Sequence, residues 1–294
     1  MPGTGAKLWI GTSGWSYPDW RGVVYPRRAG RGFHPLRYLA GFCNAVEVNA
    51  SFYALPDPRH TSQWAELVPE DFRFSFKLTR TFTHDPAGGS RAELDAFCAA
   101  LEPLRAAGRL GPVLAQFPWS FRYNRRNAER LARLADALAD QRLVIEVRHA
   151  SWDCPAGRDL LARLGTWCRI DQPPLRDCLG PDVDAPGPLA YVRLHGRNAA
   201  NWFAENIEPW QRYDYLYSRS ELREWVERLT RICAAAREVY VLANNHYRGQ
   251  GLVNALELKA LLHGGRVAVP PPLVASYPRL ADIAAPSGQM ELFD

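Results

Sequence analysis

Eight short runs of apolar residues, rich in β-branched and aromatic side chains, recur along the chain and predict β-strands. Between most of these runs, apolar residues recur at the three- and four-residue spacing of an amphipathic helix. The predicted strands are Lys7–Ser13, Ala45–Ser51, Arg73–Thr79, Pro112–Phe117, Arg142–Arg148, Thr166–Asp171, Leu189–His195 and Val239–Asn244. A chain that alternates strands and helices in this way is typical of parallel βα units.

Two of the predicted helices begin with a capping box, a serine followed three residues later by a glutamate. Ser90 opens a helix that runs towards Arg109, and Ser218 opens one that continues to about Arg237. The connection Gln172–Pro188 is rich in proline, glycine and aspartate and predicts an irregular loop. The other predicted helices are Asn124–Ala139, Leu252–Leu262, Pro35–Phe42, Thr61–Leu67 and Asp159–Leu164.

Eight βα units in a chain of 294 residues predict an α/β fold, a single (β/α)8 TIM barrel. A doubly wound open sheet is the alternative, but no Gly-x-Gly-x-x-Gly loop follows the first predicted strand. The barrel is expected over residues 1–268. Residues 269–294, which begin with a valine and three prolines, form a predicted C-terminal extension.

The composition is that of a soluble globular protein, with 47% hydrophobic and 23% charged residues. No apolar run is long enough to cross a bilayer and no signal peptide is visible, so no membrane partner is expected. Six scattered cysteines without a Cys-x-x-Cys pair argue against a disulfide scaffold or a zinc site and predict a cytoplasmic location. The formal net charge of +5 is too small to imply nucleic-acid binding by itself.

Side-chain alternation places one set of residues from each predicted strand inside the barrel. Barrel interiors are normally apolar, but here charged residues stand near the carboxyl ends of several strands, where barrel enzymes hold their chemistry. The set has three acidic residues, four basic residues and one histidine: Glu47, Glu146, Asp171, Lys77, Arg148, Arg169, Arg193 and His195. Its modest positive excess favours an anionic ligand such as a phosphate or a carboxylate. The alternative is a structural network in which these charges only neutralise one another.

Six motifs along the chain are similar to those of one family. They are GTSGWSY at 11–17, EVNASFY at 47–53, QFP at 116–118, EVRH at 146–149 followed by Ser151 and Trp152, RLHG at 193–196, and Asn244-Asn245. In this order, from about residue 8 to 263, the chain resembles the YecE-like family, domain of unknown function 72. The resemblance implies a TIM-barrel fold, in agreement with the strand count, and supplies no reaction.

The candidate catalytic residues allow several reactions. Glu146 and Glu47 have the residue types of a general acid and base pair, as in a glycoside hydrolase. Lys77 is a candidate Schiff-base nucleophile or phosphate ligand, and a salt bridge to Glu47 is its structural alternative. His84 follows the third strand, on a loop at the mouth, where it can exchange protons or cap the loop. Together with Asp171 and His195, the two glutamates also have the ligand types of a divalent-metal site for Mg²⁺ or Mn²⁺.

Aromatic and polar residues on the same side of the barrel are candidate ligand contacts. Aromatic rings beside basic groups suit stacking on a base or a sugar, although long loops also need local apolar cores. The predicted substrate-binding residues are Trp15, Asn49, Tyr53, Gln116, Arg148, His149, Arg193 and Asn244. We expect an enzyme that acts on an anionic, phosphate-bearing or nucleotide-like substrate. The competing class is a non-catalytic module that holds a nucleic-acid end or a metabolite.

The last residues predict a docking tail. Gln289, Met290, Leu292 and Phe293 match a pentapeptide with which bacterial DNA-repair and replication proteins bind the sliding clamp: Gln, Leu or Met, any residue, Leu, Phe. Leu and Phe would fill an apolar pocket, and the glutamine would supply an anchoring amide. The alternative is that Leu292 and Phe293 fold back on the barrel as a latch. Docking would link the protein to DNA metabolism.

Overall fold

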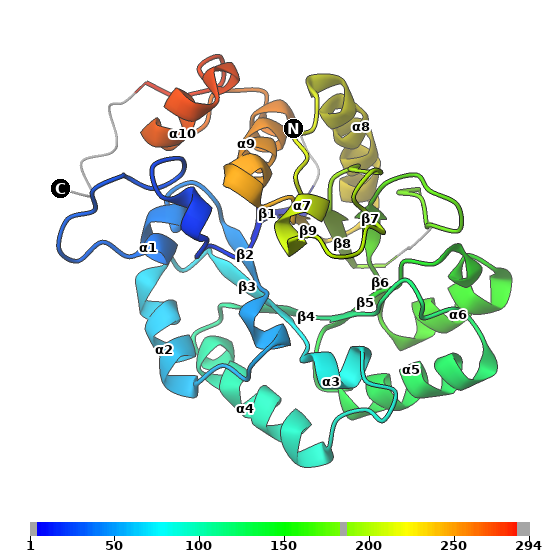
Figure 1. Cartoon of the computed structure of the whole chain (residues 1–294). Helices are drawn as coiled ribbons and strands as arrows, with labels where there is room; N and C mark the ends of the chain where they lie inside the picture. Colours follow the sequence, from blue (N-terminus) through cyan, green and yellow to red (C-terminus); the bar gives the residue numbers. More distant parts are fainter. Residues whose placement is uncertain (1–4, 183–186, 287–294) are drawn as a thin grey trace.

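The computed structural model describes residues 5–182 and 187–286. Its centre is one parallel sheet that curls into a nearly closed barrel, with helices around the outside (Figure 1). Its strands are β1 (Lys7–Ser13), β2 (Ala45–Val48), β3 (Arg73–Lys77), β4 (Leu110–Gln116), β5 (Leu143–Glu146), β6 (Thr166–Trp167), β7 (Arg169–Asp171), β8 (Leu189–Leu194) and β9 (Glu238–Ala243). The predicted α/β, TIM-barrel-like fold is confirmed.

The strand count is nine rather than the eight predicted, because the predicted strand Thr166–Asp171 divides at Cys168. The strand order is β6-β5-β4-β3-β2-β1-β9-β8-β7, so both ends of the sheet belong to this one segment. β6 pairs with β5, and the Cys168 N–H donates to the Ile145 carbonyl at 2.9 Å. β7 then pairs with β8. The segment changes its hydrogen-bonding neighbour midway and thereby brings the two edges of the sheet together.

Helices cover the outer face of the barrel (Figure 1). Both predicted capping sites are present: the Ser90 hydroxyl accepts from the Glu93 N–H, and Ser218 and Glu221 form a complete capping box. The α-helices are α1 (Pro35–Ala40), α2 (Pro58–Leu67), α3 (Arg80–Thr83), α4 (Arg91–Ala106), α5 (Arg125–Ala137), α6 (Pro155–Leu164), α7 (Pro209–Arg212), α8 (Arg219–Ala235), α9 (Gln250–His263) and α10 (Pro271–Ser276). Short 3-10 helices are η1 (Pro18–Trp20), η2 (Ala50–Phe52), η3 (Ala150–Trp152), η4 (Tyr247–Gly249) and η5 (Pro278–Leu280).

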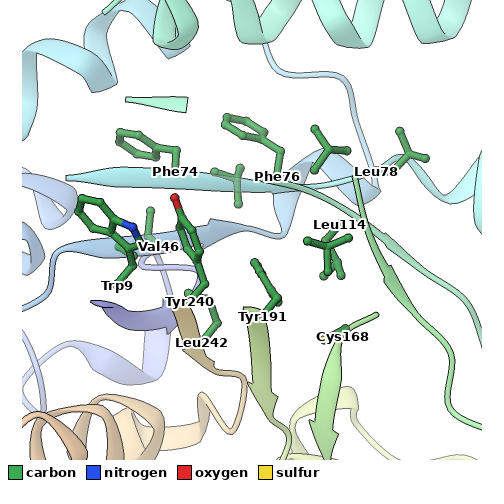
Figure 2. Packing of buried hydrophobic residues seen from close by; sticks show 14 of the residues in the cluster. Trp9, Val46, Phe74, Phe76, Leu78, Leu114, Cys168, Tyr191, Tyr240 and Leu242 are labelled. Atoms are coloured by element: carbon green, nitrogen blue, oxygen red, sulfur yellow. The ribbon is translucent and has the colours of Figure 1, made fainter. Parts of the chain in front are cut away.

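Alternation along the strands separates the helix-covered face from the barrel interior. Phe74 and Phe76 point from β3 towards the helices, whereas Trp9, Tyr191 and Tyr240 point towards the interior (Figure 2). The rings of Tyr191 and Tyr240 stack with their centroids 5.8 Å apart. These large rings fill the amino-terminal half of the interior, so the space that remains lies at the carboxyl ends of the strands.

The segment after α9 packs on the barrel. Leu273 of α10 and Leu280 of η5 are fully buried in the main apolar cluster, and Val267 pairs with Ala284. Residues 269–286 are thus anchored against the barrel by apolar contacts. None of the described helices is both long and apolar enough to cross a membrane.

Candidate functional site

A buried arginine joins two glutamates across the carboxyl end of the barrel. Arg193 of β8 donates from Nη1 to Glu146 Oε2 and from Nη2 to Glu47 Oε1, both at 2.6 Å. None of the three side chains exposes more than 1% of its surface. Burial alone would raise the pKa of Glu146, but Arg193, with His195 and Arg148, holds that pKa well below its ordinary range. Glu146 is therefore an ionised partner of Arg193, and the three side chains form one closed bridge.

The outer oxygens of both carboxylates are occupied as well. The Tyr191 hydroxyl donates to Glu47 Oε2 at 2.8 Å, and Ser75 Oγ lies 2.7 Å from the same hydroxyl. Arg148 Nε donates to Glu146 Oε1 at 2.8 Å. All four carboxylate oxygens thus accept hydrogen bonds from protein groups. These hydrogen bonds and the charge of Arg193 offset the free-energy cost of removing two carboxylates from water. In this arrangement neither glutamate presents a free oxygen for acid–base work.

His195 connects this bridge to the amides at the mouth. Its Nε2 lies 3.2 Å from Glu146 Oε1, and its Nδ1 lies 3.0 Å from Asn244 Nδ2. Burial lowers the pKa of His195 to about 3 in spite of the Glu146 carboxylate, so the ring is neutral. A neutral ring that donates from Nε2 and accepts at Nδ1 satisfies both contacts. Asn49 Nδ2 then donates to Asn244 Oδ1 at 3.4 Å.

A cavity of about 360 Å³ opens beside the bridge at the carboxyl ends of the strands. Its wall includes three basic side chains, two asparagines and four aromatic rings, and no acidic side chain reaches it among the described residues. The lining residues are Gly14, Trp15, Ser16, Tyr17, Val48, Asn49, Ala50, Tyr53, Lys77, Arg148, Arg193, Pro209, Tyr213, Asn244 and His246. The cavity therefore has a cationic wall with an apolar rim.

Lys77, the last residue of β3, is the cation on this wall that is not paired. Its Nζ lies 3.7 Å from the centroid of the Phe52 ring, and within residues 5–182 and 187–286 no carboxylate forms an ion pair with it. Burial, reinforced by Arg193 and Arg148, lowers the pKa of Lys77 to about 7. The predicted alternative, a salt bridge from Lys77 to Glu47, is absent because Arg193 and the Tyr191 hydroxyl occupy that carboxylate.

The structure brings most of the predicted site residues together. The predicted residues that line the cavity are Trp15, Asn49, Tyr53, Lys77, Arg148, Arg193 and Asn244, and Glu47, Glu146 and His195 lie directly behind them. His84 does not line the cavity. Its ring lies nearly perpendicular to the ring of Phe52, with the two centroids 4.9 Å apart. Burial and the nearby Lys77 lower the pKa of His84 to about 4, so it is uncharged at neutral pH.

Two predicted substrate-binding residues, Gln116 and His149, do not line the cavity. Gln116 is buried and donates to the Phe117 carbonyl at 2.6 Å. His149 caps η3 through Ser151, with its ring against Trp119. The predicted tail contacts, Gln289, Met290, Leu292 and Phe293, lie outside the described residues.

The prediction that Asp171 faces the barrel interior is wrong. Both of its oxygens accept from Arg197 at 2.8 Å, and one also accepts from the Trp225 indole of α8, which packs on the outer face. The ladder with β8 places Ile170 level with inward-facing Arg193 and Asp171 level with outward-facing Leu194, so the prediction put the wrong face of this strand inside the barrel. With Asp171 turned away, the described residues hold no cluster of three or more His, Cys, Asp or Glu side chains able to bind a metal. The geometry thus gives the predicted divalent-metal site no support.

Sequence reasoning missed two groups of residues. Tyr191 and Ser75, which support Glu47, stand at inward positions two residues before Arg193 and Lys77, so strand alternation could have found them. Tyr213 and His246 of the cavity wall come from loops after β8 and β9, where no periodic signal exists. The Tyr17 and His246 rings stack with centroids 4.4 Å apart and form part of the rim.

A family profile described as "Protein of unknown function DUF72" matches residues 9–276. The chain belongs to the DUF72 family. Among curated DUF72 relatives, the UPF0759 protein YunF of Bacillus subtilis is 28% identical over 270 residues, which cover 87% of this chain and 94% of YunF. The UPF0759 protein YecE of Escherichia coli K12 is 33% identical over 144 residues, which cover 48% of each chain. The family resemblance inferred from the motifs is therefore confirmed.

Solved DUF72 structures share the fold. A DUF72 protein from Thermotoga maritima superposes with a TM-score of 0.77 at 35% identity, over 87% of this chain and 99% of that one. A DUF72 protein from Enterococcus faecalis gives a TM-score of 0.76 at 25% identity, over 87% and 95% of the two chains. The barrel is thus shared by these three DUF72 proteins.

Proposed function

We propose that this DUF72 protein is an enzyme that binds an anionic, phosphate-bearing or nucleotide-like substrate in the mouth cavity. The observation that carries the proposal is the distribution of charge: Lys77, Arg148 and Arg193 reach the cavity wall, whereas both glutamates lie behind it. Clustered cationic donors at the carboxyl end of a barrel favour phosphates and carboxylates.

The charge balance around the cavity makes Lys77 the source of the net positive charge that binds an anion. Arg193 and Arg148 are balanced by Glu47 and Glu146, two cations against two anions, so protonated Lys77 supplies the excess positive charge. Since the pKa of Lys77 is lowered to about 7, chiefly by burial, a bound anion raises that pKa by favouring the ammonium. Binding of an anion therefore takes up a proton, and the affinity falls as the pH rises above about 7.

The rim of the cavity suits a ring on the substrate. Trp15, Tyr17 and Tyr213 line the same space as Lys77, so an aromatic face is available to a sugar or a base. The volume of about 360 Å³ is near the lower end of the range for small-molecule sites. These dimensions favour a single sugar phosphate or nucleotide over a polymer.

Titration calorimetry with glycerol 3-phosphate and with adenosine monophosphate tests the proposal. We expect Lys77→Met to weaken binding about tenfold or more, because a charge-assisted hydrogen bond contributes ~1.5–3 kcal/mol. The same substitution should abolish the loss of affinity between about pH 6 and pH 8 that we expect of the wild-type protein. Lys259→Met is the matched control, because Lys259 Nζ donates to the Phe42 carbonyl at 3.1 Å and does not line the cavity. If no anion binds the wild-type protein at millimolar concentration, the proposal fails.

Turnover distinguishes an enzyme from a binding module. Panels of sugar phosphates and nucleotides should yield a product with the wild-type protein and none with Lys77→Met. Binding of these anions without turnover of any would instead support the non-catalytic alternative.

A further inference from the structure

We propose that Lys77 is a nucleophile that forms an iminium with a carbonyl group of the bound anion. This inference rests on the anion-binding function proposed above and assigns it a substrate class: small phosphorylated or carboxylated aldehydes and ketones. The geometry that carries it is a lysine at the carboxyl end of a barrel strand, with its Nζ at a cavity and no carboxylate paired with it. Such a position is where barrel enzymes hold their reacting groups.

Lys77 differs from the other two lysines of the chain in its surroundings. The chain has 36 lysines and arginines, of which only Lys7, Lys77 and Lys259 are lysines. Lys7 is exposed at the amino-terminal end of β1, and Lys259 is occupied by a main-chain carbonyl. An arginine at position 77 would be a permanent cation, whereas a lysine can lose its proton and become a nucleophile.

Arg193 explains why Lys77 can lose its proton. A lysine beside a free carboxylate is held as the ammonium, which has no lone pair with which to attack. Arg193 occupies one oxygen of each glutamate at 2.6 Å, and Arg148 and the Tyr191 hydroxyl take the others. The carboxylates are thereby unavailable to Lys77, while the two arginines repel its proton. A fraction of the amine is consequently neutral near pH 7.

The reaction balances without a further reagent. The lone pair of the neutral Lys77 Nζ attacks the carbonyl carbon, a C–N bond forms as the C=O π bond breaks, and one proton passes from the nitrogen to the carbonyl oxygen to give a carbinolamine. The C–O bond then breaks, the oxygen leaves as water after taking a proton from solvent, and an iminium cation remains. In sum, one amine, one carbonyl and one proton give one iminium and one water.

The cavity fits both ends of such an adduct. The iminium retains the excess positive charge that a protonated Lys77 would bring, and it lies against the Phe52 ring, whose face attracts cations. Arg148, at the cavity wall, is placed to pair with the anionic group. Asn49 Oδ1 is buried at the wall and has no hydrogen-bond partner among the described residues, so it can accept from a substrate hydroxyl.

Reductive trapping tests the inference. The intact protein is incubated with dihydroxyacetone phosphate or with pyruvate, treated with sodium borohydride, digested, and mapped by mass spectrometry. We expect one adduct per chain, on Lys77, with the mass of the probe less one oxygen atom. The two probes distinguish a phosphate from a carboxylate as the anionic group. Excess glycerol 3-phosphate, which carries the anion but no carbonyl, should suppress trapping.

The variants separate nucleophilicity from charge. Lys77→Arg keeps a cation at the cavity, so it should weaken binding of glycerol 3-phosphate less than Lys77→Met does and lose all trapping at this position. Lys259→Met should trap as the wild-type protein does. With the probe at saturation, the trapping rate of the wild-type protein should rise with pH through a value above about 7, because the bound anion raises the pKa of Lys77 and the amine must lose its proton to attack.

Each outcome bears on one proposal or on both. Trapping confined to Lys77, lost in Lys77→Arg and suppressed by glycerol 3-phosphate, supports the iminium. Binding of glycerol 3-phosphate with no adduct, or with adducts spread over Lys7 and Lys259 as well, overturns the iminium and leaves anion binding standing. Failure of both binding and trapping overturns both proposals.

Discussion

Arg193 occupies an oxygen of each glutamate, and this contact determines what the neighbouring side chains can do. It removes both carboxylates from the cavity and leaves Lys77 as the group that can change its charge there. Strand alternation correctly predicts that Glu47, Glu146 and Arg193 share the barrel interior. It cannot predict that they form a closed bridge, because the distance across a barrel is not encoded in the spacing along any one strand.

The bridge predicts a large stability loss when its centre is removed. Arg193→Met leaves two carboxylates buried side by side, and we expect a loss of ~3–5 kcal/mol in the free energy of unfolding at neutral pH. The two carboxylates then disfavour ionisation, so the pKa of one of them rises above its unfolded value. A raised folded-state pKa contributes stability as the pH falls, and the loss should therefore shrink below about pH 5. Guanidinium unfolding of the wild-type protein and of Arg193→Met, at neutral pH and below about pH 5, measures this difference in the free energy of unfolding.

Arg142→Met is the matched control for this prediction. Arg142 pairs with Glu238 at 2.9 Å, but both side chains are substantially exposed, so the expected loss is at most ~1 kcal/mol. Equal losses for the two variants, or a loss for Arg193→Met that does not depend on pH, would contradict the assignment of the bridge.

At the scale of the element, the divided segment from β6 to β7 closes the barrel and also limits what sequence can predict. Its residues have the composition of one strand, and nothing in their pattern marks Cys168 as the point where the hydrogen-bonding neighbour changes. The inward assignment of Asp171 failed for a different reason: alternation continues through Cys168, but Ile170, level with Arg193, takes the inward position and Asp171, level with Leu194, the outward one. For β2, β5 and β8 the predicted inward face is the correct one, because the apolar residues of the opposite face leave one choice for the charged positions.

Thiol labelling of Cys168 measures how firmly this segment closes the barrel. Cys168 is fully buried, and burial, with the nearby Glu146 carboxylate, raises the pKa of its thiol well above the ordinary value. We expect labelling of Cys168 by a neutral disulfide reagent only through opening of the fold, at least about a hundredfold slower than labelling of half-buried Cys154. Comparable rates at the two cysteines would mean that the segment opens locally and that closure here is weak.

At the scale of the whole molecule, the two ends of the barrel carry different features. The first cavity lies at the carboxyl ends of the strands, whereas a second cavity of about 1290 Å³ is lined by Phe42, Val68 and Pro69, which precede β2 and β3, and by residues up to Pro286. The motifs and the strand count predicted the barrel and the first cavity's position. They could not predict the second cavity, because it forms where α10 and η5 pack beside distant helices.

This arrangement makes the tail prediction separable from the proposed reaction. The described chain reaches Pro286 at this second cavity, which lies before β2 and β3 whereas Lys77 ends β3, so clamp docking by Leu292 and Phe293 should not alter the mouth. We expect the intact chain to bind a bacterial sliding clamp at micromolar concentration and Leu292→Ala/Phe293→Ala not to bind, with unchanged affinity of both proteins for glycerol 3-phosphate. A latch on the barrel would give a different result: no clamp binding by either protein, and a lower free energy of unfolding for the double variant, because two large apolar side chains would leave a buried contact.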